Sequence, residues 1–268
     1  MIDYRCKYST NKGDGLRFSE KTLILQHENI KSFIMQKLTK TLAALFLTIA
    51  IICATGCKKN NEPNNGTYNG HDYIDLGLPS STMWATCNVG ADSPEDYGDY
   101  FAWGETQTKT TYNWSTYVYC NGDYNQLTKY CTQSDFGFNG FTDNLKTMQP
   151  SDDAATANWG EGWRTPTYSE WVELLSKCTP TKTTRNGVNG CLFTARNGNS
   201  IFLPAAGSYG DEELDHVGDN GSYWSSSINK AYPDGVKGFK FTLSWNDYDI
   251  YDLSREFGLS VRPVHASK

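Results

Sequence analysis

A run of apolar residues near the N-terminus, TLAALFLTIAIICATGC at positions 41–57, determines how much of this chain is left to fold. Lys37 and Lys40 precede about a dozen apolar residues, and small residues and Cys57 follow them. A basic start, a short apolar middle and a small-residue exit are typical of a secretory signal. The apolar middle is shorter than the roughly 20 residues that a permanent membrane-spanning helix needs. We therefore expect residues 1–56 to be removed on export.

The end of this signal, ATGC, resembles the lipobox of bacterial lipoproteins, although Ala54 stands where leucine is usual. In that family the cysteine is acylated and becomes the new N-terminus, so the resemblance implies lipid attachment at Cys57. A plain signal peptide or an uncleaved anchor is the alternative. Residues 1–34 are polar and Met35 opens a normal basic region, so we expect translation to start at Met35. The anchor implies a place in the cell envelope, at the outer membrane or the cell surface.

The composition of residues 57–268 limits the partners of the exported part. These 212 residues carry 16 Lys and Arg against 26 Asp and Glu, a net charge near −10. The length is sufficient for one domain with a substantial core. An acidic surface disfavours nucleic acid and anionic lipid headgroups. We therefore expect no nucleic-acid partner and no membrane contact beyond the lipid anchor.

The cysteines of the exported part favour disulfides over a metal site. Their spacing includes no CxxC pair, which disfavours zinc. Disulfides are the expected use of cysteine in an oxidising compartment. Cys178 with Cys191 and Cys120 with Cys131 are the candidate pairs, and Cys87 is then left as a thiol.

Residues 57–70 lack apolar periodicity and are expected to form a flexible tether, with the folded domain at residues 71–266. Short apolar runs separated by Gly, Asn, Asp and Pro are typical of strands and turns. Long loops are expected over residues 104–150. The expected strands are 73–76, 83–89, 100–103, 191–195, 201–204, 223–227, 238–243 and 259–263.

Two short helices are expected among these strands. Ser151 can cap a helix with an acidic first turn at residues 152–157. Thr167 and Glu170 form the S/T-x-x-E capping box of the second helix, whose apolar residues from Trp171 onward recur at helical spacing. The predicted fold class is α+β, with two short helices, many short and mainly antiparallel strands, and long loops.

Six motifs follow one another along the domain: YIDLGLPS (73–80), WATCNVGA (84–91), PEDYGDYFAWGET (94–106), WRTPT (163–167), YWSSS (223–227) and GLSVRPV (258–264). Together they closely resemble the Fibrobacter succinogenes major paralogous domain, a family common in surface lipoproteins of Bacteroidetes. Ser81 stands where that family usually has glycine. The run WRTPTYSEW at 163–171 is also similar to C-type-lectin-like and formylglycine-generating-enzyme domains. The resemblance implies a C-type-lectin-like fold.

A structural role is expected for the run that begins at Trp163. Pro166 fixes the start of the helix, the tryptophans fill the core, and Arg164 holds a loop carbonyl or a carboxylate. Formylglycine-generating enzymes use a late pair of cysteines, whereas no cysteine follows Cys191 here. We therefore expect a non-catalytic binding module and assign no catalytic residue. A divergent secreted enzyme of that fold and a structural component of a surface assembly are the alternatives.

The triplet WND at 245–247 matches a motif that supplies calcium and sugar ligands in C-type lectins. Hard oxygen donors suit calcium, and the candidate ligands are Asn246, Asp247 and Asp249. We expect no cofactor and an exposed polar turn at this place, and a calcium site is the alternative. Aromatic side chains beside amides and carboxylates suit a glycan or a protein partner. The candidate binding residues are Trp245, Asn246, Asp247, Asp249, Tyr251, Tyr223 and Trp224, with Trp245 and Asp247 placed first.

Overall fold

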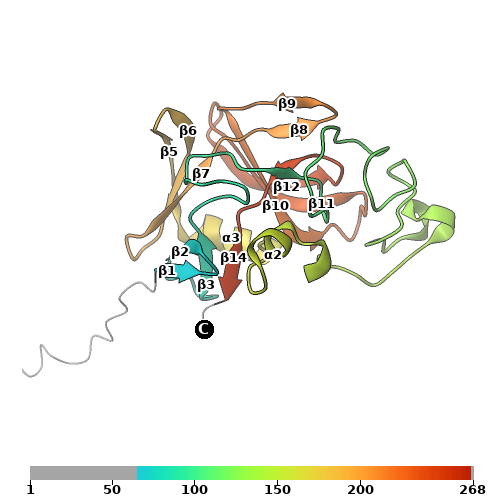
Figure 1. Ribbon diagram of the computed structural model, residues 1–268, viewed down its shortest axis with the longest axis horizontal. Coiled ribbons are helices and arrows are strands. Elements are labelled where there is room, and N and C mark those ends of the chain that lie inside the picture. Colours follow the sequence, from blue (N-terminus) through green and yellow to red (C-terminus); the bar gives the residue numbers. More distant parts are fainter. Residues whose placement is uncertain (1–64, 267–268) are drawn as a thin grey trace, which may run out of the picture. The chain divides into compact units, whose positions relative to one another are not determined.

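The computed structural model describes residues 65–266 of the chain (Figure 1). The described residues belong to one compact unit, Glu62–Lys268. The expected signal, the start at Met35 and the lipid site at Cys57 lie outside the described residues. Between residues 65 and 266, no helix is long and apolar enough to cross a membrane.

Within these residues the fold is α+β with mainly antiparallel strands, which confirms the fold class at this level. The helices are α2 (Ala154–Trp159) and α3 (Tyr168–Lys177). Three 3-10 turns accompany them: η1 (Ser134–Phe136), η2 (Phe138–Gly140) and η3 (Pro150–Asp152).

The strands form four sheets. The first has the order β1-β2-β3-β14 and consists of β1 (Gly66–Tyr68), β2 (His71–Asp75), β3 (Thr82–Ala85) and β14 (Val264–Ala266). The second has the order β12-β11-β10-β13-β4 and consists of β4 (Tyr100–Phe101), β10 (Asn220–Ile228), β11 (Gly235–Thr242), β12 (Asp247–Ser254) and β13 (Leu259–Ser260). The third contains β5 (Thr179–Arg185), β6 (Val188–Thr194) and β7 (Ser200–Pro204), and the fourth contains β8 (Ser208–Gly210) and β9 (Glu213–Asp215). All pairs are antiparallel except β10 with β13.

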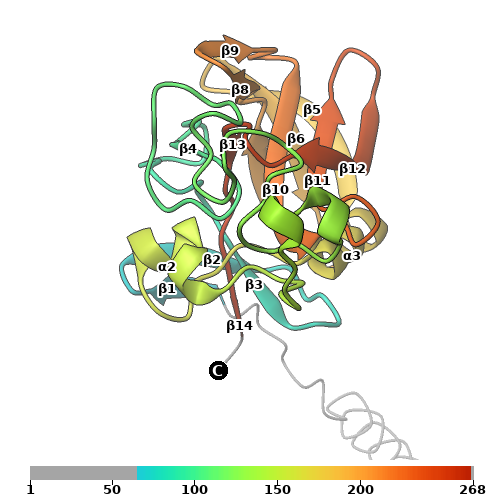
Figure 2. The same ribbon diagram turned by 90° about the vertical axis from the view of Figure 1, so that its right-hand side faces the viewer.

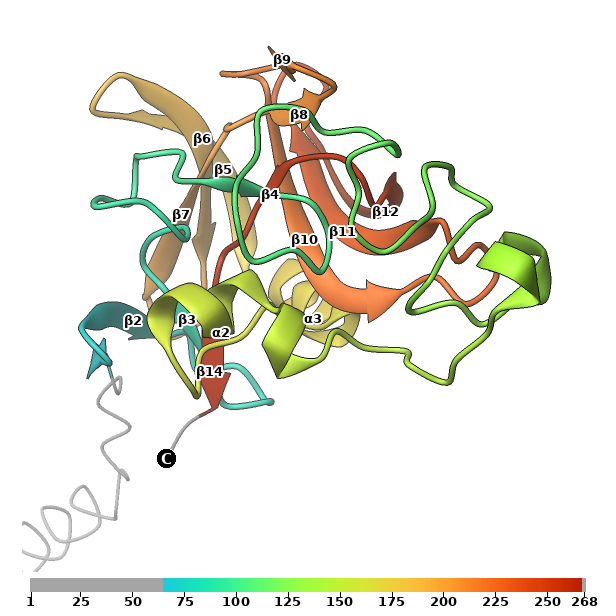
Figure 3. The ribbon, with the colours of Figure 1, turned by 45° about the vertical axis from the view of Figure 1, so that its right-hand side comes forward.

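The five-stranded sheet separates two hydrophobic clusters. Neighbouring residues of a strand point to opposite faces, and Tyr223 and Trp224 on β10 accordingly enter different clusters. Helix α3 packs on β10, β11 and β12 on the Tyr223 side (Figure 2). Strands β5, β6 and β7 lie on one side of this sheet, and the loops of residues 104–150 lie on the other side (Figure 3).

Several expected boundaries are wrong. The domain begins before residue 71, because β1 pairs with β2 from Gly66 onward. The N-cap of α2 is Asp153 and not Ser151, since a 3-10 turn occupies the preceding residues. The expected strand at 83–89 ends at Ala85. The expected strand at 259–263 is only β13, and the chain then leaves the sheet to form β14.

Arg262, in the last of the six motifs, holds three distant segments together. It is fully buried, and its guanidinium donates to the Asn88 side chain at 2.9 Å and to the Thr86 carbonyl at 2.7 Å. It also donates to the Phe202 carbonyl at 3.0 Å. Burial lowers the pKa of this guanidinium. The motif residue is therefore part of the scaffold, since its buried guanidinium is satisfied by acceptors from distant parts of the chain.

Candidate functional site

The run that opens α3 is part of the scaffold. Trp163 and Trp171 are buried, and the Trp171 indole donates to the Trp224 carbonyl at 3.1 Å. The expected capping box is present: the Glu170 amide donates to the Thr167 hydroxyl at 3.3 Å, and the Thr167 amide donates back to the Glu170 carboxylate at 2.8 Å. Pro166 directly precedes the N-cap, and its carbonyl accepts from the Ser226 amide at 2.7 Å.

Glu170 is the centre of the charged contacts at this helix start. Arg164 donates to both carboxylate oxygens, at 2.7 and 2.6 Å, and the Thr82 hydroxyl donates at 2.8 Å. Burial alone would raise the pKa of the Glu170 carboxyl, but the hydrogen bonds from Arg164 and from the Thr167 amide outweigh it and hold this pKa at about 2. Glu170 is therefore charged at neutral pH and committed to fixing the helix.

The two acids before α2 have separate structural partners. Asp153 caps α2 by accepting from the Ala155 amide at 2.9 Å, and it also accepts from the Thr165 amide at 2.8 Å. Burial raises the pKa of Asp153 in spite of these bonds. Asp152 pairs with Lys129 at 2.6 Å and also accepts from the Tyr130 hydroxyl. Each carboxylate therefore has structural partners of its own.

The WND triplet lies at the tip of the hairpin formed by β11 and β12. Trp245 has 82 % of its surface exposed, the largest fraction among the described large hydrophobic residues. Asn246 has a φ of 53°, in the left-handed region that asparagine tolerates in tight turns. The expected exposed polar turn is therefore present, although β12 begins within it, at Asp247.

The three candidate calcium ligands each have a separate partner. The Asn246 side-chain oxygen accepts from the Tyr248 hydroxyl at 3.1 Å, and Asp247 accepts from the Tyr251 hydroxyl. Asp249 accepts from the Ile250 amide at 2.7 Å. Among residues 65–266, no three His, Cys, Asp or Glu side chains are grouped so that they could hold a metal ion. Calcium at this turn stays the untested alternative to the expected absence of a cofactor.

Two of the candidate binding residues belong to the core instead. Tyr223 and Trp224 are 0 % and 1 % exposed. The Tyr223 hydroxyl donates to the Pro204 carbonyl at 2.7 Å, and the Trp224 indole donates to the Phe101 carbonyl at 2.6 Å. Their place on a central strand buries both faces, so their assignment to a ligand site is wrong.

The expected disulfide bridges are not formed in the described part of the chain, where all five cysteines are thiols. Cys120 donates to the Trp114 carbonyl at 3.1 Å and Cys131 to the Gln133 carbonyl at 3.0 Å. Cys178 and Cys191 lie in the hydrophobic core, and burial raises the pKa of their thiols to about 11 and about 12. Free buried cysteines of this kind behave as small apolar residues.

A small hollow of about 360 Å³ lies beside the hairpin tip, and we name it the tip pocket. Its lining includes Leu243 and Ser244, which directly precede Trp245 in the chain. Polar groups in the lining are held by one another: Ser244 donates to Asp219 through both its amide, at 2.7 Å, and its hydroxyl, at 2.9 Å. The other lining residues are Lys182, Thr183, Thr184, Asn189 and Gly218.

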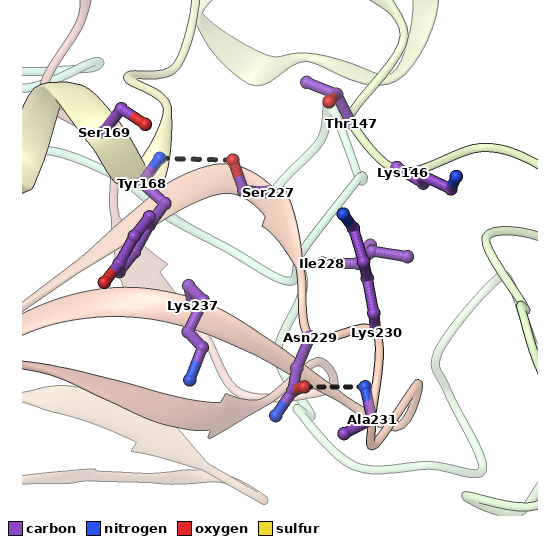
Figure 4. A pocket seen from close by; sticks show the side chains of 10 residues that line it. All are labelled: Lys146, Thr147, Tyr168, Ser169, Ser227, Ile228, Asn229, Lys230, Ala231 and Lys237. Carbon is purple, nitrogen blue, oxygen red and sulfur yellow. Dashed lines mark hydrogen bonds between the residues drawn. The ribbon is translucent and has the colours of Figure 1, made fainter.

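A second hollow of about 490 Å³ lies where α3 begins and β10 ends, and we name it the lysine pocket (Figure 4). Its charged side chains are Lys146 from the long loops, Lys230 from the loop after β10 and Lys237 from β11. Tyr168 and Ser227 lie on the α3 side, joined by a bond of 3.1 Å from the Tyr168 amide to the Ser227 hydroxyl. The remaining lining residues are Thr147, Ser169, Ile228, Asn229 and Ala231.

A groove of about 500 Å³ between α3 and β12 shares Tyr168 and Lys237 with the lysine pocket. It continues past Val172 to Tyr248, two residues from Asn246 at the hairpin tip. Sequence reasoning missed the lysine pocket and this groove. No local motif could have indicated them, because the three lysines are spread over positions 146–237 and meet only through tertiary packing.

Comparison of the chain with protein-family models, with curated proteins and with solved structures gave no match.

Proposed function

We propose that this chain is a lipid-anchored protein of the cell envelope whose folded domain is a non-catalytic binding module for an extracellular glycan or protein. The observation that carries this proposal is Trp245, an indole 82 % exposed at the tip of an ordered hairpin. Exposing an indole costs free energy unless a partner covers it. Tryptophan is also the residue type most enriched where single side chains dominate binding.

The tip pocket favours a glycan as the ligand. Its hydroxyl, amide and carboxylate groups are already positioned by bonds to one another, such as Asn189 to the Gly218 carbonyl at 3.0 Å. A sugar ring presents an apolar face to an aromatic side chain and hydroxyl groups to polar neighbours. Trp245 next to such a pocket offers both kinds of contact, since positioned polar groups provide orientation and specificity.

The test of the site is the variant Trp245→Ala. We expect its affinity for the ligand to fall at least tenfold, about 1.4 kcal/mol, with the domain still folded. The ligand is first sought on glycan and protein arrays, probed with and without Ca²⁺, and the variant is then titrated by calorimetry. Tyr232→Ala, which removes another exposed aromatic ring from the loop before β11, is the matched control. Equal affinity of Trp245→Ala and wild type would move the site away from the hairpin tip.

The proposed family and fold are the major paralogous domain and its C-type-lectin-like architecture. Ser81 supports this, because its φ of 57° lies in the region where glycine, the usual residue of that family here, is favoured. The buried guanidinium of Arg262 and the capping box at Thr167 give the shared motifs a scaffold role. Proteins can share motif residues because those residues stabilise the same fold, without sharing an activity.

The enzymatic alternative gains no support from the carboxyl groups with perturbed pKa values. Those groups are Asp152, Asp153, Glu170 and Glu256, and each is hydrogen-bonded to a neighbouring side chain. Structural ion pairs and caps perturb pKa values as active sites do. A non-catalytic module therefore remains the proposal that the geometry favours.

The lipid anchor is tested at the expected acylation site. Radiolabelled fatty acid should be incorporated into the wild-type protein and not into Cys57→Ala. Cys53→Ala is the matched control, because Cys53 lies within the expected signal and should not affect labelling. Equal labelling of the Cys57→Ala variant would remove the anchor from the proposal.

A further inference from the structure

We propose that the lysine pocket is a second binding site, separate from the hairpin tip, and that it takes an anionic saccharide, a sugar bearing a carboxylate or a sulfate ester. It opens between the first residues of α3 and the end of β10, and Figure 4 shows its side chains coming from separate segments around one hollow. Its volume of about 490 Å³ is within the range of small-molecule sites in proteins.

The charge of the lining is the first argument. Residues 65–266 carry 13 Lys and Arg against 25 Asp and Glu, so the surface of the domain is acidic. The lysine pocket nevertheless collects Lys146, Lys230 and Lys237, and no Asp or Glu is among its lining residues. Like charges around one hollow repel each other, and an anion relieves that repulsion.

The second argument is which of the three ammonium groups already has an ion-pair partner. Lys237 pairs with Asp252 on the neighbouring strand at 2.6 Å. The ion pairs among the described residues involve neither Lys146 nor Lys230, and both side chains are exposed. Two of the three ammonium groups are therefore without an ion-pair partner and free to bind a ligand, while the third is held by Asp252.

The uncharged groups of the pocket favour a sugar over a bare anion or an acidic peptide. Tyr168 is 42 % exposed and offers a ring face, with hydroxyl groups from Ser169 and Thr147 in the same lining. The Asn229 side-chain oxygen accepts from the Ala231 amide at 2.9 Å, which leaves its NH₂ group available as a donor. A ring, several hydrogen-bonding groups and ammonium groups together match an acidic sugar residue.

The groove between α3 and β12 extends this site. Because the groove shares Tyr168 and Lys237 with the lysine pocket, a chain bound in the pocket can continue along α3 toward Tyr248. Asp249 lines the Tyr248 end of the groove, so an uncharged sugar unit suits that end better than an acidic one. We therefore expect oligomers to bind more tightly than the single acidic sugar, since a second contact is made at high effective concentration.

The experiment compares three oligosaccharides of equal length with the folded domain: oligogalacturonate, a sulfated galactan and a neutral galactan. Titration calorimetry is done at low and high salt, about 0.05 and 0.5 M. The charged oligomers should bind and the neutral one should not, with weaker binding at high salt. The carboxylated and sulfated arms identify which anionic group is preferred.

The variant Lys146→Ala/Lys230→Ala should lower the affinity for the bound charged oligomer at least tenfold, about 1.4 kcal/mol. The control Lys177→Ala/Arg196→Ala removes the same charge from two other exposed positions and should leave the affinity unchanged. Equal losses of affinity in the two variants would mean that the oligomer is attracted only by the net charge of the domain, and would overturn the proposal. So would binding of the neutral oligomer with equal affinity, or lysine-dependent binding of polyglutamate as tight as that of the sugar.

Trp245→Ala separates this proposal from the function proposed at the hairpin tip. The variant should retain its affinity for the charged oligomer, because the lysine pocket does not include Trp245. Loss of the charged oligomer from Trp245→Ala, with full binding by the lysine variant, would place the anion at the hairpin tip and overturn the second site. No binding of either charged oligomer would overturn it as well.

Discussion

Two short segments of this domain share tryptophan, tyrosine and acidic residues but differ in how these side chains are buried. The segment at the start of α3, residues 163–171, and the tip of the β11–β12 hairpin, residues 243–251, both combine tryptophan, tyrosine and acidic residues. In the first, Trp171 is fully buried and Glu170 is almost so. In the second, Trp245 is 82 % exposed, and Asp247 and Asp249 accept hydrogen bonds from near neighbours in the chain.

The difference between the two segments lies in their partners, not in their residue types. Glu170 receives hydrogen bonds from Thr82, 88 positions away, and Trp171 packs on Trp84 with ring centroids 4.8 Å apart. In the hairpin tip the long-range bonds come from Ser244, which donates to Asp219, whereas the bonds of the acidic residues are local, such as Tyr251 to Asp247. Aromatic and acidic residues therefore stabilise the fold where distant segments converge on them, and remain available for binding where none do.

The largest effect that would test this comparison is expected for Trp171→Ala. Removing a buried tryptophan that stacks on Phe239 at 4.7 Å should lower the free energy of unfolding by about 3–5 kcal/mol. Urea denaturation followed by circular dichroism measures it, with Trp171→Phe as a milder variant if the alanine variant does not fold. A loss below about 1 kcal/mol would contradict the scaffold role of this segment.

Glu170→Ala should cost somewhat less, about 3 kcal/mol, because it leaves the partly buried Arg164 unpaired and removes the Glu170 side-chain half of the capping box of α3. Denaturation of the variant and the wild type at neutral pH gives the difference. The control is Glu161→Ala, an exposed acid just before the same run, which should change the stability by less than about 0.5 kcal/mol. Similar losses in both variants would mean that general charge, not the cap, is responsible.

The pH dependence of the free energy of unfolding should reflect the hydrogen bonds that Glu170 accepts. The pKa of Glu170 is lowered in the folded state from 4.5 to about 2, so its stabilisation is complete above pH 4.5 and is lost as the pH falls toward 2. Glu170→Gln should therefore flatten the stability curve in that window. Asp153 and Glu256 have raised pKa values, which act in the opposite direction, but they are present in both proteins and cancel in the difference.

A smaller effect, of opposite sign, is expected for Ser81→Gly. Ser81 is exposed with a φ of 57°, a conformation that glycine adopts without strain, so the variant should be more stable by about 0.5–1 kcal/mol. The matched control is Asn186→Gly, also at positive φ, where asparagine already tolerates the conformation and little change is expected. A destabilised Ser81→Gly variant would weaken the family resemblance at this loop.

The smallest effect on stability is expected for Trp245→Ala, the counterpart of Trp171→Ala. An indole that is 82 % exposed contributes little to folding, so the free energy of unfolding should change by less than about 0.5 kcal/mol. The same denaturation experiment measures it, and binding is then measured on a protein known to be folded. A loss above about 2 kcal/mol would show that the tip is part of the scaffold after all.

Local chemistry made much of the scaffold predictable. The capping box at Thr167 and Glu170 was readable because a helix start is satisfied by residues three positions apart. Strands β6, β7, β10 and β11 were expected from their apolar runs, which lie in the core. Strands β5 and β12 were missed because they are polar edge strands, held by backbone bonds to a neighbour rather than by an apolar pattern.

The sequence by itself determined the α+β class, the cap of α3 and the exposed turn at Trp245, since each depends on residues close together in the chain. Only the tertiary structure decided that Tyr223 and Trp224 are core residues, because their burial depends on which strands flank β10. It alone brought Lys146 and Lys230 to one pocket, 84 positions apart in the chain. The physical reason is that caps and turns are satisfied locally, whereas burial and the grouping of charges depend on how distant segments pack.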